Sequence, residues 1–256
     1  MAQDLWTREQ TILAFNLYCK IPYGTIHGRN PKLHELAKIL GRSPGAVGRK
    51  MQNLASFDPY HKARGVKGLS NASKLDEKIW NEFNGNWNDL VYESELLLAK
   101  KQDIPIEQKF KINEDRLASK TGETRLQLVK MRVNQSFFRS VVLGMYNTRC
   151  AVSGINLPDM LRASHIVPWS KNKQERINPE NGICLSALYD AAFDKGYIGI
   201  DTDYRIIIAN KLKKYSKEAY YQEQFGKLEG RSLYLPDKFL PRQSFLEFHL
   251  NEIFNK

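Results

Sequence analysis

The stretch that decides the fold reads LRASHIVPWSKNKQERINPENGICLSALYDAAFDKG, from Leu161 to Gly196. Short apolar runs broken by turn residues, at Arg149–Gly154 and Leu161–Val167, predict a two-stranded ribbon. A loop is expected at Asn178–Gly182 and a short helix at Ile183–Phe193. The expected order of elements is therefore strand, strand, helix.

Polar side chains recur along this stretch, with His165 in the second predicted strand, Asn181 in the loop, Asp190 in the helix and Asp194 directly after it. A single histidine on a strand is usually structural, and an Asn-Gly pair is usually a turn. Their combination favours one site. Residues four apart lie on the same helix face, so the two carboxylates could share a metal ion. Asp194 could instead cap the turn at Gly196.

Several segments resemble the HNH (ββα-metal) domain of bacterial restriction endonucleases. They are Arg149–Gly154, Ser164–Ile166, Asn178–Gly182 and Phe193–Gly196, within a similarity that spans about residues 132–209. Two further segments, Gln135–Arg139 and Pro241–Phe254, are also similar to that family. The resemblance therefore covers the second half of the chain.

The resemblance implies a metal-dependent endonuclease in which His165 is the general base and Asn181 the structural asparagine of the catalytic site. Phosphodiester hydrolysis needs an activated water and a cation that neutralises charge on the transition state, and a histidine can accept the water's proton near neutral pH. The amide of Asn181 is expected to bridge the loop backbone. The implied metal ligands are Asp190 foremost, with Asp194 and Ser164 as further candidates, and the expected cofactor is Mg²⁺, Mn²⁺ or another divalent metal.

Two positions depart from the family pattern. Many HNH sites have Asp or His directly before the base, where this chain has Ser164, and serine is a weak ligand. Relatives often read Leu-His-Asp before the Phe-Asp pair, whereas this chain reads Leu188-Tyr189-Asp190. Either the metal site is altered, or the cation keeps more water and only one or two carboxylates, as Mg²⁺ tolerates.

The first part of the chain predicts helices with clear end signals. Thr7 is expected to cap a helix at Arg8–Lys20, and a second helix is expected at Pro31–Leu40. Gly41 suits a left-handed turn, and Ser43-Pro44 is a helix start. This helix, tight turn, helix order is typical of a DNA-binding helix-turn-helix and equally of an ordinary helical hairpin.

Candidate DNA contacts in this part of the chain lie on the second helix of that pair and in a loop. Arg49, Lys50 and Asn53 are expected to face solvent there and to reach a groove or phosphates. The basic loop Lys62–Lys74 could touch the DNA backbone or be merely solvated.

The fold class expected is α+β, with a mainly helical N-terminal region followed by a ββα-metal nuclease domain. Polar and charged residues between Ala99 and Glu123 predict a boundary, which gives domains at residues 1–110 and 123–256. A helix is predicted at Thr124–Tyr146 and a β-hairpin at Tyr197–Ile200 and Tyr204–Ala209.

Composition favours a nucleic-acid partner and no membrane. Lys and Arg number 39 against 28 Asp and Glu, a formal charge of +11, which suits a polyanion such as DNA. No stretch approaches the roughly 20 apolar residues of a membrane span, so a cytoplasmic location is expected. The scattered residues Cys19, Cys150 and Cys184 indicate buried thiols rather than a disulfide framework or a zinc ribbon.

The function expected is a DNA endonuclease in restriction or another defence against foreign DNA. A homing or repair nuclease is an alternative enzyme, and a DNA-binding regulatory protein with a degenerate HNH site is an alternative of another class. The sequence contains one constellation around His165, so cleavage of both strands would need two sequential events or a homodimer on DNA.

Overall fold

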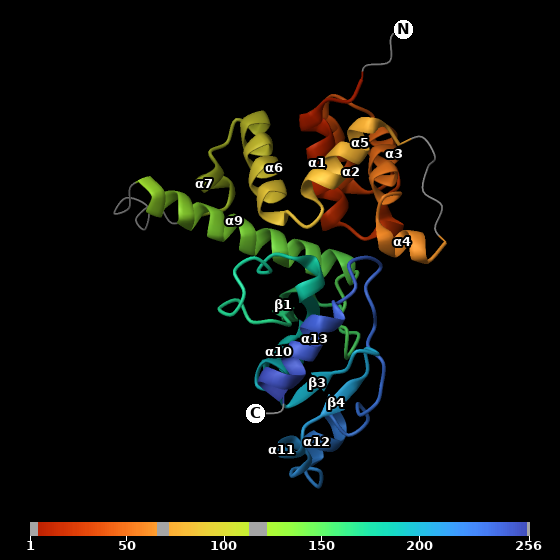
Figure 1. Ribbon diagram of the computed structural model, residues 1–256, viewed down its shortest axis with the longest axis vertical. Coiled ribbons are helices and arrows are strands. Elements are labelled where there is room, and N and C mark those ends of the chain that lie inside the picture. Colours follow the sequence, from red (N-terminus) through yellow and green to blue (C-terminus); the bar gives the residue numbers. More distant parts are fainter. Residues whose placement is uncertain (1–4, 66–71, 113–121, 255–256) are drawn as a thin grey trace. The chain divides into compact units, whose positions relative to one another are not determined.

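The computed structural model describes residues 5–65, 72–112 and 122–254. The chain forms two compact units, residues 1–141 and 142–256 (Figure 1). The division falls inside the long helix α9 (Gly122–Met145), whereas we expected a boundary between Ala99 and Glu123. Residues 113–121 of that expected boundary, and residues 66–71 of the basic loop Lys62–Lys74, lie outside the described residues. The domain bounds 1–110 and 123–256 stay a prediction.

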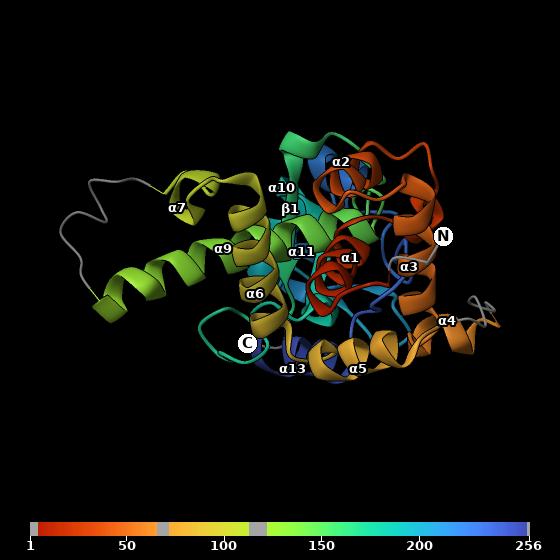
Figure 2. The same ribbon diagram turned by 90° about the horizontal axis from the view of Figure 1, so that it is seen from above.

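The first unit is built of helices around a central one. Figure 2 shows α1 among α2, α3, α5 and α6. Helix α1 contacts all four of these helices. Phe15 and Tyr18 of α1 are fully buried, and the Phe15 ring stacks on Trp80 with centroids 5.0 Å apart. The described helices of this unit are α1 (Arg8–Lys20), η1 (Tyr23–Thr25), α2 (Pro31–Leu40), α3 (Pro44–Ala55), α4 (Pro59–Ala63), α5 (Lys74–Phe83), α6 (Trp87–Gln102), α7 (Ile106–Lys109) and α9 as far as residue 141.

The helix ends predicted from local signals are confirmed. The Thr7 side chain accepts from the Gln10 amide in a capping box at the start of α1. Gly41 ends α2 in the left-handed region with φ of 65°, and the Ser43 hydroxyl caps α3 by accepting from the Ala46 amide. Helices α2 and α3 therefore form the expected helix, turn, helix.

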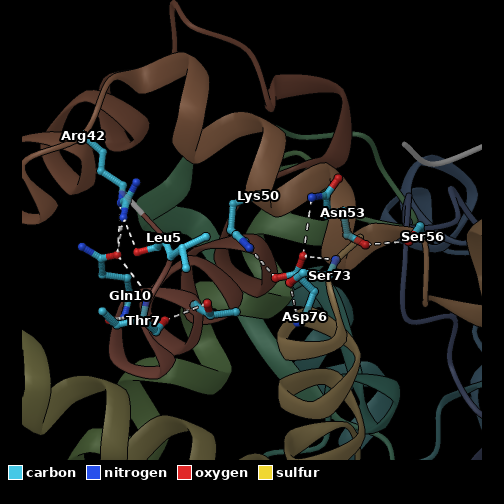
Figure 3. A network of polar contacts seen from close by, with 10 residues as sticks. Leu5, Thr7, Gln10, Arg42, Lys50, Asn53, Ser56, Ser73 and Asp76 are labelled. Carbon is cyan, nitrogen blue, oxygen red and sulfur yellow. Dashed lines mark hydrogen bonds and ion pairs between the residues drawn. The ribbon is translucent and has the colours of Figure 1, made fainter. Parts of the chain in front are cut away.

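The solvent-exposed face that we assigned to α3 is largely wrong. Lys50 is only 5% exposed, because its ammonium lies 2.5 Å from an oxygen of the fully buried Asp76 on α5 (Figure 3). Asn53 is half-buried and donates to the other oxygen of that carboxylate at 3.5 Å. Helix α5 packs against this side of α3, so of the three predicted residues Arg49 alone is exposed.

The second unit contains two small antiparallel sheets and short helices. In the first sheet β1 (Leu161–His165) pairs with β2 (Gly182–Ser186), and in the second β3 (Ile198–Ile200) pairs with β4 (Ile206–Ile208). The helix α10 (Ala187–Asp194) follows β2 directly. The remaining elements are η2 (Pro158–Met160), η3 (Pro179–Asn181), α11 (Asn210–Lys213), α12 (Ala219–Gln224), α13 (Gln243–His249) and η4 (Leu250–Phe254).

The strand, strand, helix order is confirmed, but the first ribbon strand was placed wrongly. Arg149–Gly154 forms a turn, in which the Cys150 amide donates to Ile155 and the Gly154 amide to Cys150. The partner of β1 is Gly182–Ser186, which we expected to be a loop end and a helix start. All five residues of β2 are buried, and a short buried apolar run has no periodicity that separates strand from helix. The helix consequently begins at Ala187 rather than Ile183.

The second hairpin is confirmed, and glycines let the chain end pack against it. A Cβ at Gly199 would lie 2.9 Å from side-chain atoms of both Leu250 and Phe254. A Cβ at Gly196, whose φ is 62°, would lie 2.4 Å from the Ile253 carbonyl oxygen. The Gly196 of the Phe-Asp-Lys-Gly segment is therefore required for this close approach.

The mixture of helices and small sheets confirms the α+β class. Cys19, Cys150 and Cys184 are buried thiols, as expected. Within the described residues, no helix combines the length and the apolar character that a membrane crossing requires.

Candidate active site

His165 is the last residue of β1, and its ring is held in a defined orientation. Its Nε2 lies 2.7 Å from the Arg176 carbonyl oxygen. A carbonyl oxygen only accepts, so Nε2 carries the proton and Nδ1 of the neutral ring carries the lone pair. The ring also lies edge-on to Trp169, with centroids 5.5 Å apart and planes at 82°. Arg176 holds that indole in turn, through a 2.8 Å hydrogen bond to the Trp169 carbonyl and a guanidinium 4.9 Å from its ring.

The surroundings keep the His165 ring neutral. Burial lowers its pKa below the ordinary value of 6.5, and this effect outweighs the hydrogen bond to Arg176 and the charge of Asp190, which both raise it. A ring with a pKa below 6.5 is mostly unprotonated at neutral pH. Nδ1 is therefore able to accept a proton from water there.

Asn181 joins the loop after β1 to the strand that carries the histidine. Its side chain is 1% exposed, and its Oδ1 accepts from the Val167 amide at 2.8 Å. Its Nδ2 donates to the Val167 carbonyl at 3.1 Å and to the Glu175 carbonyl at 3.0 Å. The Asn181 carbonyl also accepts from the Ile166 amide at 3.0 Å. These bonds fix the backbone on both sides of the turn that follows His165.

Arg242, which sequence reasoning missed, fastens the same loop from the C-terminal part of the chain. Its guanidinium donates to the Glu180 carboxylate at 2.5 and 2.8 Å and lies 3.6 Å from Glu175. Its amide donates to the Glu180 carbonyl at 3.1 Å. No local signal marks Arg242 or Arg176 for these roles, because both depend on partners that folding brings together.

Asp190 and Asp194 lie one turn apart on α10. Asp190 is half-buried and Asp194 lies at the exposed end of the helix. Partial burial of the Asp194 carboxyl, followed by the negative charge of Asp190, raises the pKa of Asp194 to about 6. Asp190 also acts electrostatically on His165. A cation held between the two carboxylates would relieve their mutual repulsion.

These donors fit a hard divalent cation better than a zinc ion. Across the described parts of the chain, no three His, Cys, Asp or Glu residues form a group that could hold a metal. Mg²⁺ typically keeps several waters and binds one or two carboxylates together with substrate phosphates, which suits Asp190 and Asp194. A structural zinc site needs four protein ligands.

Residues 150–201 match a family model described as HNH endonuclease. The chain contains an HNH domain. The match includes β1, β2 and α10 and all four of His165, Asn181, Asp190 and Asp194. An HNH endonuclease domain indicates nuclease activity on nucleic acid. No curated protein matches the chain.

Ser164, the third candidate metal ligand, precedes His165 in β1 of the HNH domain. It is 3% exposed, and its hydroxyl has no hydrogen-bond partner among the described residues. Successive residues of a regular strand point to opposite faces of the ribbon, so Ser164 and His165 diverge. The role of Ser164 as a ligand stays a prediction.

Tyr189 and His249 are packed against other parts of the second unit. Tyr189, where relatives of the HNH pattern often have histidine, donates its hydroxyl to the Gln224 carbonyl at 2.8 Å and lies edge-on to Phe225. His249 is 1% exposed and stacks on Phe193 with centroids 3.6 Å apart, and burial lowers its pKa to about 4. Tyr189 therefore packs against α12.

Proposed function

We propose that this protein is a divalent-metal-dependent endonuclease that hydrolyses phosphodiester bonds of DNA at the HNH domain. The observation that carries the proposal is the environment of His165, whose Nε2 is bonded to the Arg176 carbonyl and whose pKa is lowered by burial. This combination supplies a neutral imidazole with its lone pair on Nδ1, which is what a general base for water requires.

Each side chain of the site has a separate task in this proposal. His165 accepts the proton of the attacking water at Nδ1, and Asn181 holds the His-bearing strand against the loop through its three side-chain hydrogen bonds. Asp190 and Asp194 would hold Mg²⁺ or Mn²⁺, which when bound supplies positive charge to the phosphate oxygens. Water is thereby deprotonated beside a neutralised phosphate.

DNA is favoured as the substrate by the formal charge of +11. Arg49 on α3 is exposed and stays a candidate phosphate contact, whereas Lys50 and Asn53 are engaged with Asp76. Restriction or another defence against foreign DNA is the role that we infer from the family resemblance. A cytoplasmic location, expected from the absence of a long apolar stretch in the sequence, stays a prediction. Cleavage of both strands by one site per chain would need two sequential events or a homodimer on DNA.

The test is single-turnover cleavage of plasmid DNA with Mg²⁺ or Mn²⁺ by the parent and by His165→Ala. We expect His165→Ala to lose cleavage and to keep its affinity for DNA, because phosphate contacts come from other residues. His27→Ala, which removes an exposed histidine of the first unit, is the matched control and should cut like the parent. Equal cleavage rates for the parent and His165→Ala would show that the base is assigned wrongly.

A DNA-binding regulatory protein with a degenerate HNH site is the second candidate. It is favoured by Ser164 before the base and by Tyr189, whose hydroxyl is bonded to Gln224. The plasmid assay separates the two functions, because a regulator binds DNA but leaves it uncut at every metal concentration.

A further inference from the structure

An aromatic pocket lies on the side of α10 away from its two carboxylates. It measures about 420 Å³, within the usual range for small-molecule sites, and is formed by α10, α11, α12 and the residues around them. Its lining includes the rings of Tyr197, Tyr215, Tyr220 and Phe225, together with Lys195. Figure 1 shows α11 and α12 together beyond β4 in this unit.

Two of the rings that line this pocket are exposed, whereas Phe225 is buried at its base. Tyr215 and Tyr220 are each 49% exposed, and Leu188 at the rim is 46% exposed. The two tyrosine rings lie 6.4 Å apart and are tilted by 44°, so neither ring covers the face of the other. An exposed apolar patch around a hollow is typical of a ligand-binding or interaction site.

Lysines outnumber carboxylates around the rings: Glu218 acts electrostatically on Tyr220, and Glu229 pairs with Lys213 at 3.1 Å. The segment 210–217 reads NKLKKYSK, with four lysines and no acidic residue. Within it Lys211 lies 5.1 Å from the Tyr197 ring and donates to the Lys195 carbonyl at 2.8 Å. Lys214 and Lys217 are exposed. This surface therefore combines aromatic faces with ammonium groups, which suits a ligand that has both planar rings and anionic groups.

We propose that this pocket binds an unstacked nucleobase of a single-stranded segment of the substrate, with the lysines on its phosphates. The proposal rests on the proposed function, because it names the form of nucleic acid that reaches the same domain. Aromatic side chains in a basic groove are the usual means of binding single strands without sequence preference. A second protein chain fits less well, because lysine is depleted in protein–protein interfaces.

Helix α10 connects the pocket to the candidate active site. At 100° per residue, Leu188, Ala191 and Lys195 lie on a different side of the helix from Asp190 and Asp194. A helix with its side chains is roughly 10–12 Å across. The bound base would therefore lie within a few nucleotides of the scissile phosphate.

The experiment measures fluorescence anisotropy of a labelled single-stranded oligonucleotide and of the matching duplex, with chelator in place of divalent metal. Tyr215→Ala and Tyr220→Ala should each weaken single-strand binding by about fivefold to a hundredfold, the range found for one lost base–aromatic stack. Duplex binding should change much less. Tyr215→Phe keeps the ring and should bind like the parent. Tyr234→Ala, which removes a 51% exposed tyrosine outside the pocket, is the matched control.

Unchanged single-strand affinity in both alanine variants would overturn the proposal. A second result would also overturn it: the parent sediments as a dimer, the alanine variants sediment as monomers, and affinity for DNA does not change. The pocket would then bind a second copy of the chain. Plasmid cleavage by the same proteins separates the two proposals. If the parent cuts DNA and the variants bind single strands normally, the proposed role of the pocket alone is refuted. If the parent never cuts DNA and the variants lose single-strand binding, the proposed nuclease activity alone is refuted.

Discussion

Replacing Asn181 by Asp exchanges one side-chain NH₂ group for oxygen and keeps the shape. The Oδ1 atom can still accept from the Val167 amide at 2.8 Å. The second oxygen, however, faces the carbonyl oxygens of Val167 and Glu175, to which Nδ2 now donates at 3.1 and 3.0 Å. Two hydrogen bonds are lost, and two carbonyl oxygens lose a donor beside a side chain that is 1% exposed.

The loss of stability follows from these contacts. Two hydrogen bonds together with two buried acceptors left without a donor cost about 3–5 kcal/mol. A loss of this size lowers the melting temperature by roughly 10 °C in a chain of this length. We therefore expect Asn181→Asp to unfold at lower urea concentration and at lower temperature than the parent.

The assay combines urea unfolding with single-turnover cleavage at a temperature where the variant is folded. Because Asn181 orients the His-bearing strand and touches no substrate in the proposal, the cleavage rate constant should fall while DNA affinity stays unchanged. Asn172→Asp is the matched control in the same loop, since its Oδ1 accepts from the Gln174 and Glu175 amides and a carboxylate preserves both bonds. Parent-like stability and cleavage in Asn181→Asp would refute the reasoning.

Two further predictions concern a buried ion-pair cluster and the metal ligands. Burial alone would raise the pKa of Glu95, but Lys20 and Lys109, at 2.5 and 2.9 Å, outweigh it and lower the pKa to about 2 from 4.5. The stabilisation by the Glu95 carboxylate is therefore complete above pH 4.5 and is lost as the pH falls toward 2, so Glu95→Gln should lower the free energy of unfolding at pH 7 by about 3 kcal/mol. The free energy of unfolding in urea should then depend less on pH across the acid range in the variant than in the parent. An unchanged pH dependence would contradict this. Asp190→Asn should lower cleavage more than Asp194→Asn, and Mn²⁺ should partly restore its activity in a metal titration. If Asp190→Asn titrates like the parent while Asp194→Asn needs far more metal, Asp194 rather than Asp190 is the principal metal ligand.

Helix ends were predictable because the atoms that form them are close in sequence. The hydroxyl of Thr7 caps the helix that begins at the next residue, and Gly41 and Ser43 form the turn between α2 and α3. The HNH constellation was predictable for a related reason, since His165 and Asn181 belong to one short strand–loop–strand segment. Asn181 is hydrogen-bonded to Ile166 and Val167, which directly follow His165, so the segments that meet are close in sequence.

The remaining features depended on packing between distant segments. Lys50 looks like a solvated residue in sequence, and only the approach of α5 brings the carboxylate of Asp76 to it. The apolar segment Gly182–Ser186 gave no period, and its pairing with β1 made it a strand. The sequence alone thus determined the helix caps, the HNH motif and the class of fold, whose signals reside in neighbouring residues. Tertiary structure alone decided which charges are buried, which run pairs as a strand and how Arg242 fastens the His165 loop, because burial and pairing are properties of surfaces that meet only on folding.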